Sequence, residues 1–554
     1  MMPNLTTTHD VFNQPRPLVD VNLYAGNRAL RDALAFHLPG RDEATSLAQG
    51  ERWGSLEWQT HARLANTHTP RLQTHDRFGH RIDRVEFHPS YHALMGEAVA
   101  AGLHGRPWSL GAGAHIERAA AFMLFTELEP SILCPISMTY AVTPALRANA
   151  KVTEDWFGKL ASTAYDPRLV PFTDKPGVTM GMGMTEKQGG SDVRANTTRA
   201  MIVEPGSPWG ARAEVTGHKW FFSAPMCDAF LILAQEEGGL SCFFLPRVLP
   251  DGTLNAIRIQ RLKDKLGNHA NASSEVEFHA ASAWRVGEVG RGVAQILEMG
   301  TLTRLDCALG TAGLMRQALS LALNHTAQRS AFGRKLIEQP LMKNVLADMA
   351  LESEAATALA LRLARAIDRQ DDPFEALMRR VLTPVAKFWI CKRGSMLGQE
   401  AMECLGGNGY VEEAGEGVMA RIYREMPLNS IWEGAGNIMA LDLLRALRGG
   451  GKGGSVAEAL AAELATARGA NAAFDRVADA LPARIDAAVD ETEARRLAQD
   501  VALAVQASLL RRHAPDVVFD AFCRSRLGGD WGQAFGTLPA GTAFDALIAR
   551  AMPT

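Results

Sequence analysis

The stretch MTEKQGGSDVRA, Met184–Ala195, gathers residue types that suit the binding of a flat ligand. Its paired glycines, Gly190 among them, leave backbone N–H groups open to close approach, and Thr185 and Ser191 add short hydroxyl donors. The spacing matches neither a Walker loop nor G-x-G-x-x-G, so it does not predict a phosphate cradle. We therefore predict a flavin-binding loop with contacts from Met184, Thr185, Gly190 and Ser191. A hydroxyl-rich turn between two strands is the alternative.

A second stretch, GHKWFFSAP at Gly217–Pro225, places three aromatic residues before a serine. Aromatic residues in a strand most often belong to the core. In a β domain that already carries a donor loop, one of them could instead wall a flavin ring while Ser223 donates to flavin N5. We assign Phe221, Phe222 and Ser223 to the cofactor site.

The elements that must position these residues follow from the periodicity along the 554-residue chain. Apolar residues recur with a helical period up to about residue 180, and a period typical of strands follows to about residue 284. Long Ala/Leu-rich helical segments then continue to about residue 447, and RGGGKGGS reads as a linker before a helical tail. The sequence predicts an α+β multidomain protein with helical (1–180), β (181–290) and helical-bundle (291–448) domains, a glycine linker (449–455) and a C-terminal helical domain (456–554).

Composition excludes several classes of protein. The net charge is -3, so the whole molecule has no field that would draw it to nucleic acid or to a membrane. No apolar run approaches the roughly 20 residues that span a bilayer, and the N-terminus does not read as a signal peptide. We expect a cytoplasmic protein without membrane contact. The seven cysteines are scattered, which predicts free, buried thiols and neither a disulfide framework nor a metal site.

The residues from Gly183 to Ala195 match the signature of the acyl-CoA dehydrogenase family position by position, and the sequence is identified as a member of that family. QRSAFGRKL resembles the family's R-x-x-F-G-x-x-L segment, and ECLGGNGY its Q-x-x-G-G-x-G-Y segment. The resemblance covers roughly residues 100 to 445. It implies an N-terminal helical domain, a middle β-barrel and a C-terminal four-helix bundle. It also implies that flavin adenine dinucleotide (FAD) is shared between subunits, with contacts from Arg329, Phe332, Gly406 and Gly407.

NSIWEGAGNIM is similar to the family's segment that carries the catalytic glutamate, which places that role on Glu433. The glutamate takes the α-proton of an acyl thioester while the β-hydride leaves for the flavin. A thioester α-hydrogen is a very weak acid, so the base needs a dry pocket that raises its pKa. Some members carry the base on an earlier helix, where this chain has Thr303. The resemblance also assigns Trp432 and Asn437 to the cofactor site.

The tail and the segment RIYREMPLNSIWEGAGN resemble the AidB, or alkylation-response, branch of the family. That branch implies a homotetramer, weak acyl-CoA dehydrogenase activity and binding of double-stranded DNA through basic residues. We assign DNA contacts to Arg445 and Arg448. Residues 451–554 carry eleven basic and thirteen acidic side chains, so the DNA surface would have to be a local patch. Candidates for that patch are Arg421, Arg424, Lys452 and the pairs Arg495/Arg496, Arg511/Arg512 and Arg524/Arg526. Solvated helix faces and structural salt bridges are the alternative reading of these arginines.

Two functions fit the sequence. The first is an AidB-like flavoprotein that binds double-stranded DNA, helps protect it from alkylation and keeps a weak, isovaleryl-type dehydrogenase activity. The second is a metabolic dehydrogenase for short or branched acyl-CoA thioesters that has no DNA role.

Overall fold

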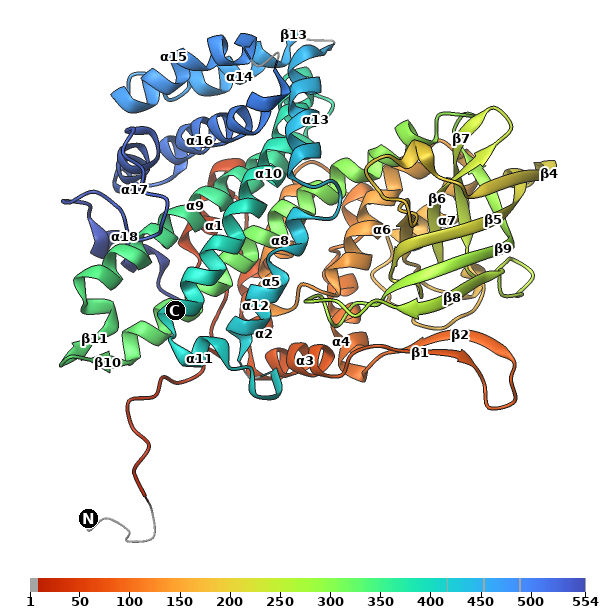
Figure 1. Ribbon diagram of the computed structural model, residues 1–554, viewed down its shortest axis with the longest axis horizontal. Coiled ribbons are helices and arrows are strands. Elements are labelled where there is room, and N and C mark those ends of the chain that lie inside the picture. The colour runs from red at the N-terminus through yellow and green to blue at the C-terminus, as the bar shows by residue number, and fades with distance from the viewer. Residues whose placement is uncertain (1–7, 416, 452–453, 488–489, 554) are drawn as a thin grey trace.

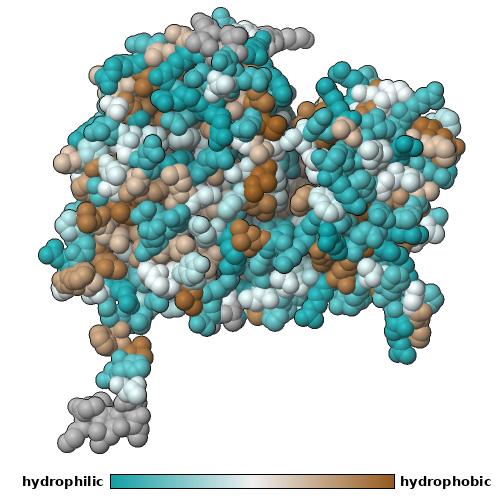
Figure 2. Space-filling model, viewed as in Figure 1, coloured by the Kyte–Doolittle hydropathy of each residue, from teal (hydrophilic) through white to brown (hydrophobic). Residues whose placement is uncertain are grey.

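The computed structural model describes residues 8–415, 417–451, 454–487 and 490–553. Its bundle of long helices is flanked on one side by a β domain and capped by the C-terminal helices (Figure 1). In the space-filling view the surface is mostly hydrophilic and is indented between the bundle and the β domain (Figure 2). No helix of the described residues is long and apolar enough to cross a bilayer.

The N-terminal region is helical, as expected, with one exception. The core helices α5 and α6 are buried almost all round, because α5 packs on α8 and α9 and α6 packs on α8. Between α3 and α4 the chain forms a β-hairpin that the helical reading missed; Arg71 pairs with Glu86, and Gly79 turns with a φ of 90°. The elements are α1 (Arg28–His37), α2 (Ala44–Gly54), α3 (Leu56–Thr67), β1 (Arg71–His75), β2 (Arg81–Glu86), α4 (Pro89–Ala100), α5 (Ala114–Leu128), α6 (Leu133–Leu146) and α7 (Ala150–Leu160).

The β domain closes on itself. Its strands follow the order β3-β6-β4-β5-β9-β7, and β7 pairs back with β6, while β8 adds to β9. Buried phenylalanines such as Phe222, Phe230 and Phe278 fill the interior. The strands are β3 (Met180–Gly183), β4 (Arg199–Ser207), β5 (Gly210–Ser223), β6 (Ala229–Glu236), β7 (Gly239–Pro246), β8 (Ile257–Leu262) and β9 (Ser273–Val286).

Four helices form the bundle: α8 (Gly292–Gln328), α9 (Pro340–Asp368), α10 (Pro373–Cys404) and α13 (Gly436–Arg448). Their starts follow known capping chemistry, since Pro340 and Pro373 occupy first-turn positions and the Asp372 side chain accepts from two backbone N–H groups of α10. The short elements β10 (Ser330–Ala331) and β11 (Arg334–Lys335) form a hairpin between α8 and α9. The helices α11 (Gly407–Tyr410) and α12 (Val418–Glu425) connect α10 to α13.

The C-terminal helices pack on the bundle through buried ion pairs. Arg526 is 1% exposed and bonds Asp348 and Glu352 of α9, and Arg362 bonds Glu463 at 2.9 Å. The linker is a small hairpin in its described part, because β12 (Gly450–Gly451) pairs with β13 (Gly454–Ser455); Lys452 lies outside the described residues. The helices are α14 (Val456–Ala465), α15 (Ala472–Ala487), α16 (Ala494–His513), α17 (Asp516–Phe522) and α18 (Phe544–Ala551). All seven cysteines are free and buried, which confirms that prediction.

Candidate active site

The glycine-rich loop follows β3 and is anchored by a buried ion pair. Glu186 and Lys219 are both 0% exposed, and their side chains meet at 2.9 Å. Glu186 also accepts from the backbone N–H groups of Thr197 and Thr198 at 2.7 and 3.1 Å. A Cβ on Gly190 would lie 2.4 Å from Oγ1 of Thr185, so the loop can close over Thr185 only with glycine at this position. The loop therefore presents its backbone in a fixed shape.

The loop and the aromatic strand β5 are joined by a backbone hydrogen bond from Trp220 to Thr185 of 2.9 Å. Phe221 is 53% exposed and Ser223 is half-buried on the same face of the strand. Phe222 points the other way: it is fully buried, and its ring lies 4.3 Å from that of Phe230. The structure thus brings Phe221 and Ser223 to the face of the loop but leaves the Phe222 side chain in the core, as the alternation of side chains along a strand requires.

Glu433 lies just before α13 in a conformation that its neighbours hold in place. Its backbone has a φ of 60°, which is uncommon for a residue with a side chain. The Thr303 hydroxyl donates to Oε2 at 2.8 Å, and Arg304 Nε donates to the backbone carbonyl at 3.0 Å. Lys387, which is 1% exposed, donates to the carbonyls on both sides of the residue, of Trp432 at 2.7 Å and of Gly434. The catalytic segment is therefore fixed from α8 and α10.

Burial raises the pKa of the Glu433 carboxyl above its ordinary value, although the Thr303 hydrogen bond and the charges of Arg304 and Lys387 pull the pKa down. A carboxylate with a raised pKa is the kind of base that proton abstraction from carbon needs. Thr303 cannot act as a base, but its hydroxyl donates to the Glu433 carboxylate, which can.

The two other residues predicted near the base have contacts of different kinds. The Trp432 indole N–H donates to Oδ1 of Asn429 at 3.0 Å and is half-buried. Asn437 is exposed, and its Oδ1 accepts from Arg495 of α16 at 3.2 Å. The C-terminal helices therefore reach the segment that carries the base.

A second group of predicted cofactor residues lies at the end of the bundle away from the β domain (Figure 1). Oε1 of Gln14 accepts from Arg329 at 3.2 Å and from Asn408 at 3.4 Å, which ties the segment after α8 to the turn of Gly406 and Gly407. Phe332 at the hairpin tip is 98% exposed with a φ of 53°. The space around the Gly406 and Gly407 Cα atoms is open.

The arginines predicted to contact DNA divide into two kinds. Arg445 and Arg448 in the last turn of α13 are exposed, and Arg445 makes no side-chain hydrogen bond or ion pair with the described residues. Arg526 is buried, Arg421 is 7% exposed, and Arg512 pairs with the buried Glu463. These three arginines make structural contacts, which was the alternative to a DNA-binding role, and they are not part of a surface patch.

Comparison with known proteins extends the likeness to the whole chain. Residues 13–167 match the Adaptive response protein AidB N-terminal domain, residues 181–281 the acyl-CoA dehydrogenase middle domain and residues 290–448 the acyl-CoA dehydrogenase C-terminal domain. The chain is 48% identical to the putative acyl-CoA dehydrogenase AidB of Escherichia coli K12 over 523 residues, 94% of each protein. It belongs to the acyl-CoA dehydrogenase family, in the AidB branch. Members of this family are FAD-dependent oxidoreductases.

Solved structures agree with the family and its fold. The Bd2924 apo-form superposes with a TM-score of 0.82 at 29% identity, over 91% of this chain and all of that one. Caenorhabditis elegans ACDH-11 in complex with C11-CoA superposes with a TM-score of 0.82 at 26% identity, over 94% of this chain and 93% of that one. The expected acyl-CoA dehydrogenase fold is confirmed.

Several residues that surround the candidate active site were not predicted from the sequence. Lys265 Nζ donates to Ser273 Oγ at 3.3 Å, and Ser273 lies 3.4 Å from Ser223, so a hydrogen-bonded chain leads from a lysine to the predicted N5 donor. Burial lowers the pKa of Lys265 to about 8. Lys265, Lys387 and the Glu186–Lys219 pair were not predicted because each of them looks like an ordinary charged residue in the sequence. Only the burial of these side chains in the fold reveals their roles. The described residues hold no group of three or more His, Cys, Asp or Glu side chains placed to bind a metal ion.

Proposed function

We propose that this protein dehydrogenates an acyl-CoA thioester, with Glu433 as the base that takes the α-proton. The observation that carries the proposal is the Glu433 carboxyl itself, which has a raised pKa and a hydrogen bond to Thr303 of 2.8 Å. The structure of ACDH-11 in complex with C11-CoA, at 26% identity, supports a thioester as the substrate class. FAD, when bound, would supply the acceptor for the hydride that leaves the β-carbon.

The residues of the glycine loop and β5 fit a flavin. Thr185, Ser191 and Ser223 offer hydroxyl donors, and Phe221 offers an exposed aromatic face beside them. In this arrangement the loop and strand hold the ring, Ser223 donates a hydrogen bond towards its reactive edge, and Lys387 and Arg304 hold the backbone that aims the base.

Anaerobic mixing with isovaleryl-CoA and a panel of other thioesters tests this function. The wild type should lose its visible flavin absorbance. The Glu433→Gln variant should do so at least about 10²-fold more slowly, because a positioned general base contributes about 10² to 10⁴ in rate. A Glu57→Gln variant, which makes the same change at an exposed glutamate on α3, is the control. An absence of bleaching by every thioester in the wild type would refute a dehydrogenase role.

A second copy of the chain completes the cofactor site in this proposal. One chain carries Phe221 and Ser223 at the β domain and Arg329, Phe332, Gly406 and Gly407 at the remote end of the bundle (Figure 1). Phe332 at the tip of the hairpin is 98% exposed and has a strained backbone, so it is suited to burial against a second copy of the chain. We propose a homotetramer in which these groups meet. In Phe332→Ala, light scattering should detect smaller species and FAD should be retained less well, whereas Phe78→Ala at the tip of the other exposed hairpin should change neither.

We further propose that the protein binds double-stranded DNA and helps protect it from alkylation. The likeness to AidB, an adaptive response protein by the name of its N-terminal domain, supports this role, as does the exposure of Arg445 and Arg448. Duplex binding should weaken steeply between roughly 50 and 200 mM salt and should fall in Arg445→Ala. Arg369→Ala, which removes an exposed arginine at the end of α9, serves as the control. Absence of binding at low salt would remove the DNA role and leave the metabolic dehydrogenase as the better function.

A further inference from the structure

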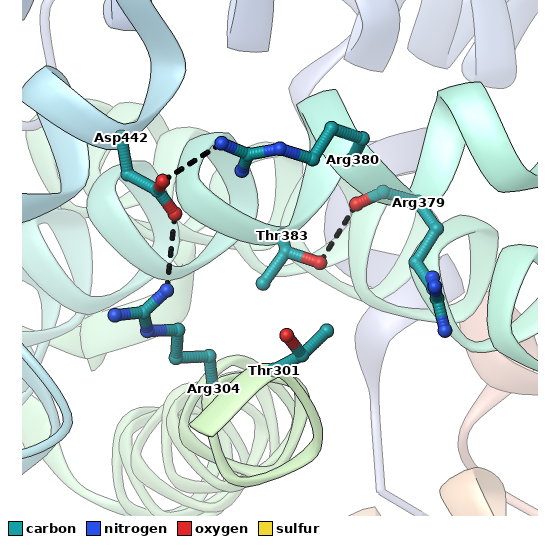
Figure 3. Close-up of a pocket in the computed structure, with 6 residues that line it drawn as sticks. All are labelled: Thr301, Arg304, Arg379, Arg380, Thr383 and Asp442. Atoms are coloured by element: carbon teal, nitrogen blue, oxygen red, sulfur yellow. Dashed lines mark hydrogen bonds and ion pairs between the residues drawn. The ribbon is translucent and has the colours of Figure 1, made fainter. Parts of the chain in front are cut away.

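A small polar pocket lies between α8, α10 and α13, next to the catalytic segment but outside the residues assigned to flavin. Its volume is about 80 Å³. Arg304 and Thr301 line it from α8, Arg379, Arg380 and Thr383 from α10, and Asp442 from α13 (Figure 3).

The pocket carries more positive charge than its one acid can neutralise. Asp442 accepts from Arg304 and from Arg380, each at 3.0 Å. Arg379 lies on the other side of the pocket (Figure 3), where its NH1 donates to Oε1 of Gln370 at 2.9 Å. Among the described residues Arg379 has no ion pair. Three guanidinium groups thus line a pocket that holds a single carboxylate, and two of the three contact it.

One acid outside the pocket lining, Glu298, acts on Arg379 by its charge. Glu298 lies one turn before Thr301, is exposed and forms no ion pair with the described residues. Burial lowers the pKa of Arg379, because partial removal from water disfavours the charged guanidinium. Arg379 is a half-buried cation that forms no ion pair with the described residues, and an anion that enters the pocket would give it one.

We propose that this pocket binds a phosphate group. Each guanidinium has N–H donors beyond those already used, and the planar fork of arginine suits two oxygens of a tetrahedral oxyanion. The phosphate comes either from free inorganic phosphate or from the CoA part of a thioester. The second source rests on the proposed dehydrogenase function.

Occupancy of the pocket acts on the base through Arg304. The same guanidinium that lines the pocket donates Nε to the Glu433 carbonyl at 3.0 Å. An anion beside Arg304 holds that side chain in the orientation that fixes the strained backbone at Glu433, so anion binding and the order of the catalytic segment are coupled.

The test titrates the FAD-loaded enzyme with inorganic phosphate at constant ionic strength, set with sodium chloride, and follows the melting temperature. We expect a saturable rise in the wild type. Arg379→Gln and Arg380→Gln should each raise the apparent Kd about tenfold, because a charge-assisted hydrogen bond is lost. Arg369→Gln, with the same change of charge at an exposed site outside the pocket, should behave as the wild type.

A competition experiment identifies the source. If CoA displaces phosphate and 3′-dephospho-CoA does so at least about tenfold less well, the ligand is the CoA phosphate. If neither displaces phosphate, the ligand is free phosphate. The proposal is overturned if phosphate has no saturable effect on the wild type, or if Arg369→Gln weakens it as much as the two pocket variants. Because the readout is melting temperature, a failure of dehydrogenation would leave the result intact.

Discussion

Two glutamates lie in the region predicted to hold the flavin, and their surroundings shift their pKa values in opposite directions. At Glu186, burial pushes the pKa up, but Lys219 and the hydrogen bonds from Thr197 and Thr198 more than offset it, so the pKa falls well below its ordinary value. At Glu433, burial outweighs Thr303, Arg304 and Lys387, and the pKa rises. The difference is that a cation touches the first carboxylate, whereas the cations near the second bond backbone carbonyls.

This contrast separates a structural charge from a reactive one. Glu186 holds a loop in shape and is stable only as an anion, because Lys219 is buried against it. Glu433 accepts one short hydrogen bond from a neutral hydroxyl, which leaves its other oxygen without a donor among the described residues. A carboxylate of the second kind can gain and lose a proton without breaking the fold.

The largest expected effect is the loss of stability when the Glu186–Lys219 ion pair is broken. Glu186→Gln leaves Lys219 as a buried cation without a counter-charge, so we expect the free energy of unfolding to drop by about 3–5 kcal/mol. Denaturant unfolding of the variant measures this drop. The Glu186→Gln/Lys219→Met double variant should recover part of it, and Glu433→Gln should cost far less. An equal loss in Glu186→Gln and Glu433→Gln would show that both glutamates are structural.

A second effect appears at low pH and must be kept apart from the titration of the base. His37 and His513 are packed together between α1 and α16, and burial lowers their pKa values to about 2 and about 4. The unfolded chain therefore binds protons first as pH falls below about 6.5, and stability declines by about 1.4 kcal/mol per pH unit for each histidine. The decline at His513 should stop near pH 4. Unfolding as a function of pH, compared between the wild type and His513→Phe, measures it.

The smallest expected effect is a change in the pH dependence of flavin reduction, which reports the pKa of Glu433. Its raised pKa places the acid limb of flavin reduction above the ordinary carboxyl range, and the rate rises as pH increases through that limb. Thr303→Val removes a hydrogen bond that lowers this pKa, so the limb should move to higher pH. Rate–pH profiles of flavin reduction test the direction. Thr326→Val, near the other end of α8, where the hydroxyl donates to backbone carbonyls of the same helix, should leave the profile in place.

The sequence predicted the reactive glutamate more readily than the structural one. Glu433 lies in a segment that resembles the family's catalytic segment, whereas Glu186 in the loop after β3 pairs with Lys219, which is 33 residues away on β5. Local patterns predicted the loop, the β domain and the bundle. The β1–β2 hairpin was missed because helices surround it. The alternation of side chains along β5 distinguishes the buried Phe222 from the exposed Phe221.

The C-terminal arginines show why the rest could not be predicted. Arg512 and Arg526 look like surface charges in an amphipathic sequence, but their partners are Glu463, Asp348 and Glu352, of which the last two lie more than 170 positions away. Ion pairs over such separations leave no local signal. The same holds for Gln14, which joins two predicted cofactor segments from the other end of the chain.

The most direct test of the central claim isolates proton abstraction from hydride transfer. A thioester analogue with sulfur at the β position has an α-proton but no β-hydride to give, so α-proton exchange in heavy water reports the base alone. The FAD-loaded wild type should catalyse the exchange, and Glu433→Gln should do so at least about 10²-fold more slowly while it keeps its FAD and its melting temperature. Exchange at the wild-type rate in Glu433→Gln would contradict the assignment of the base.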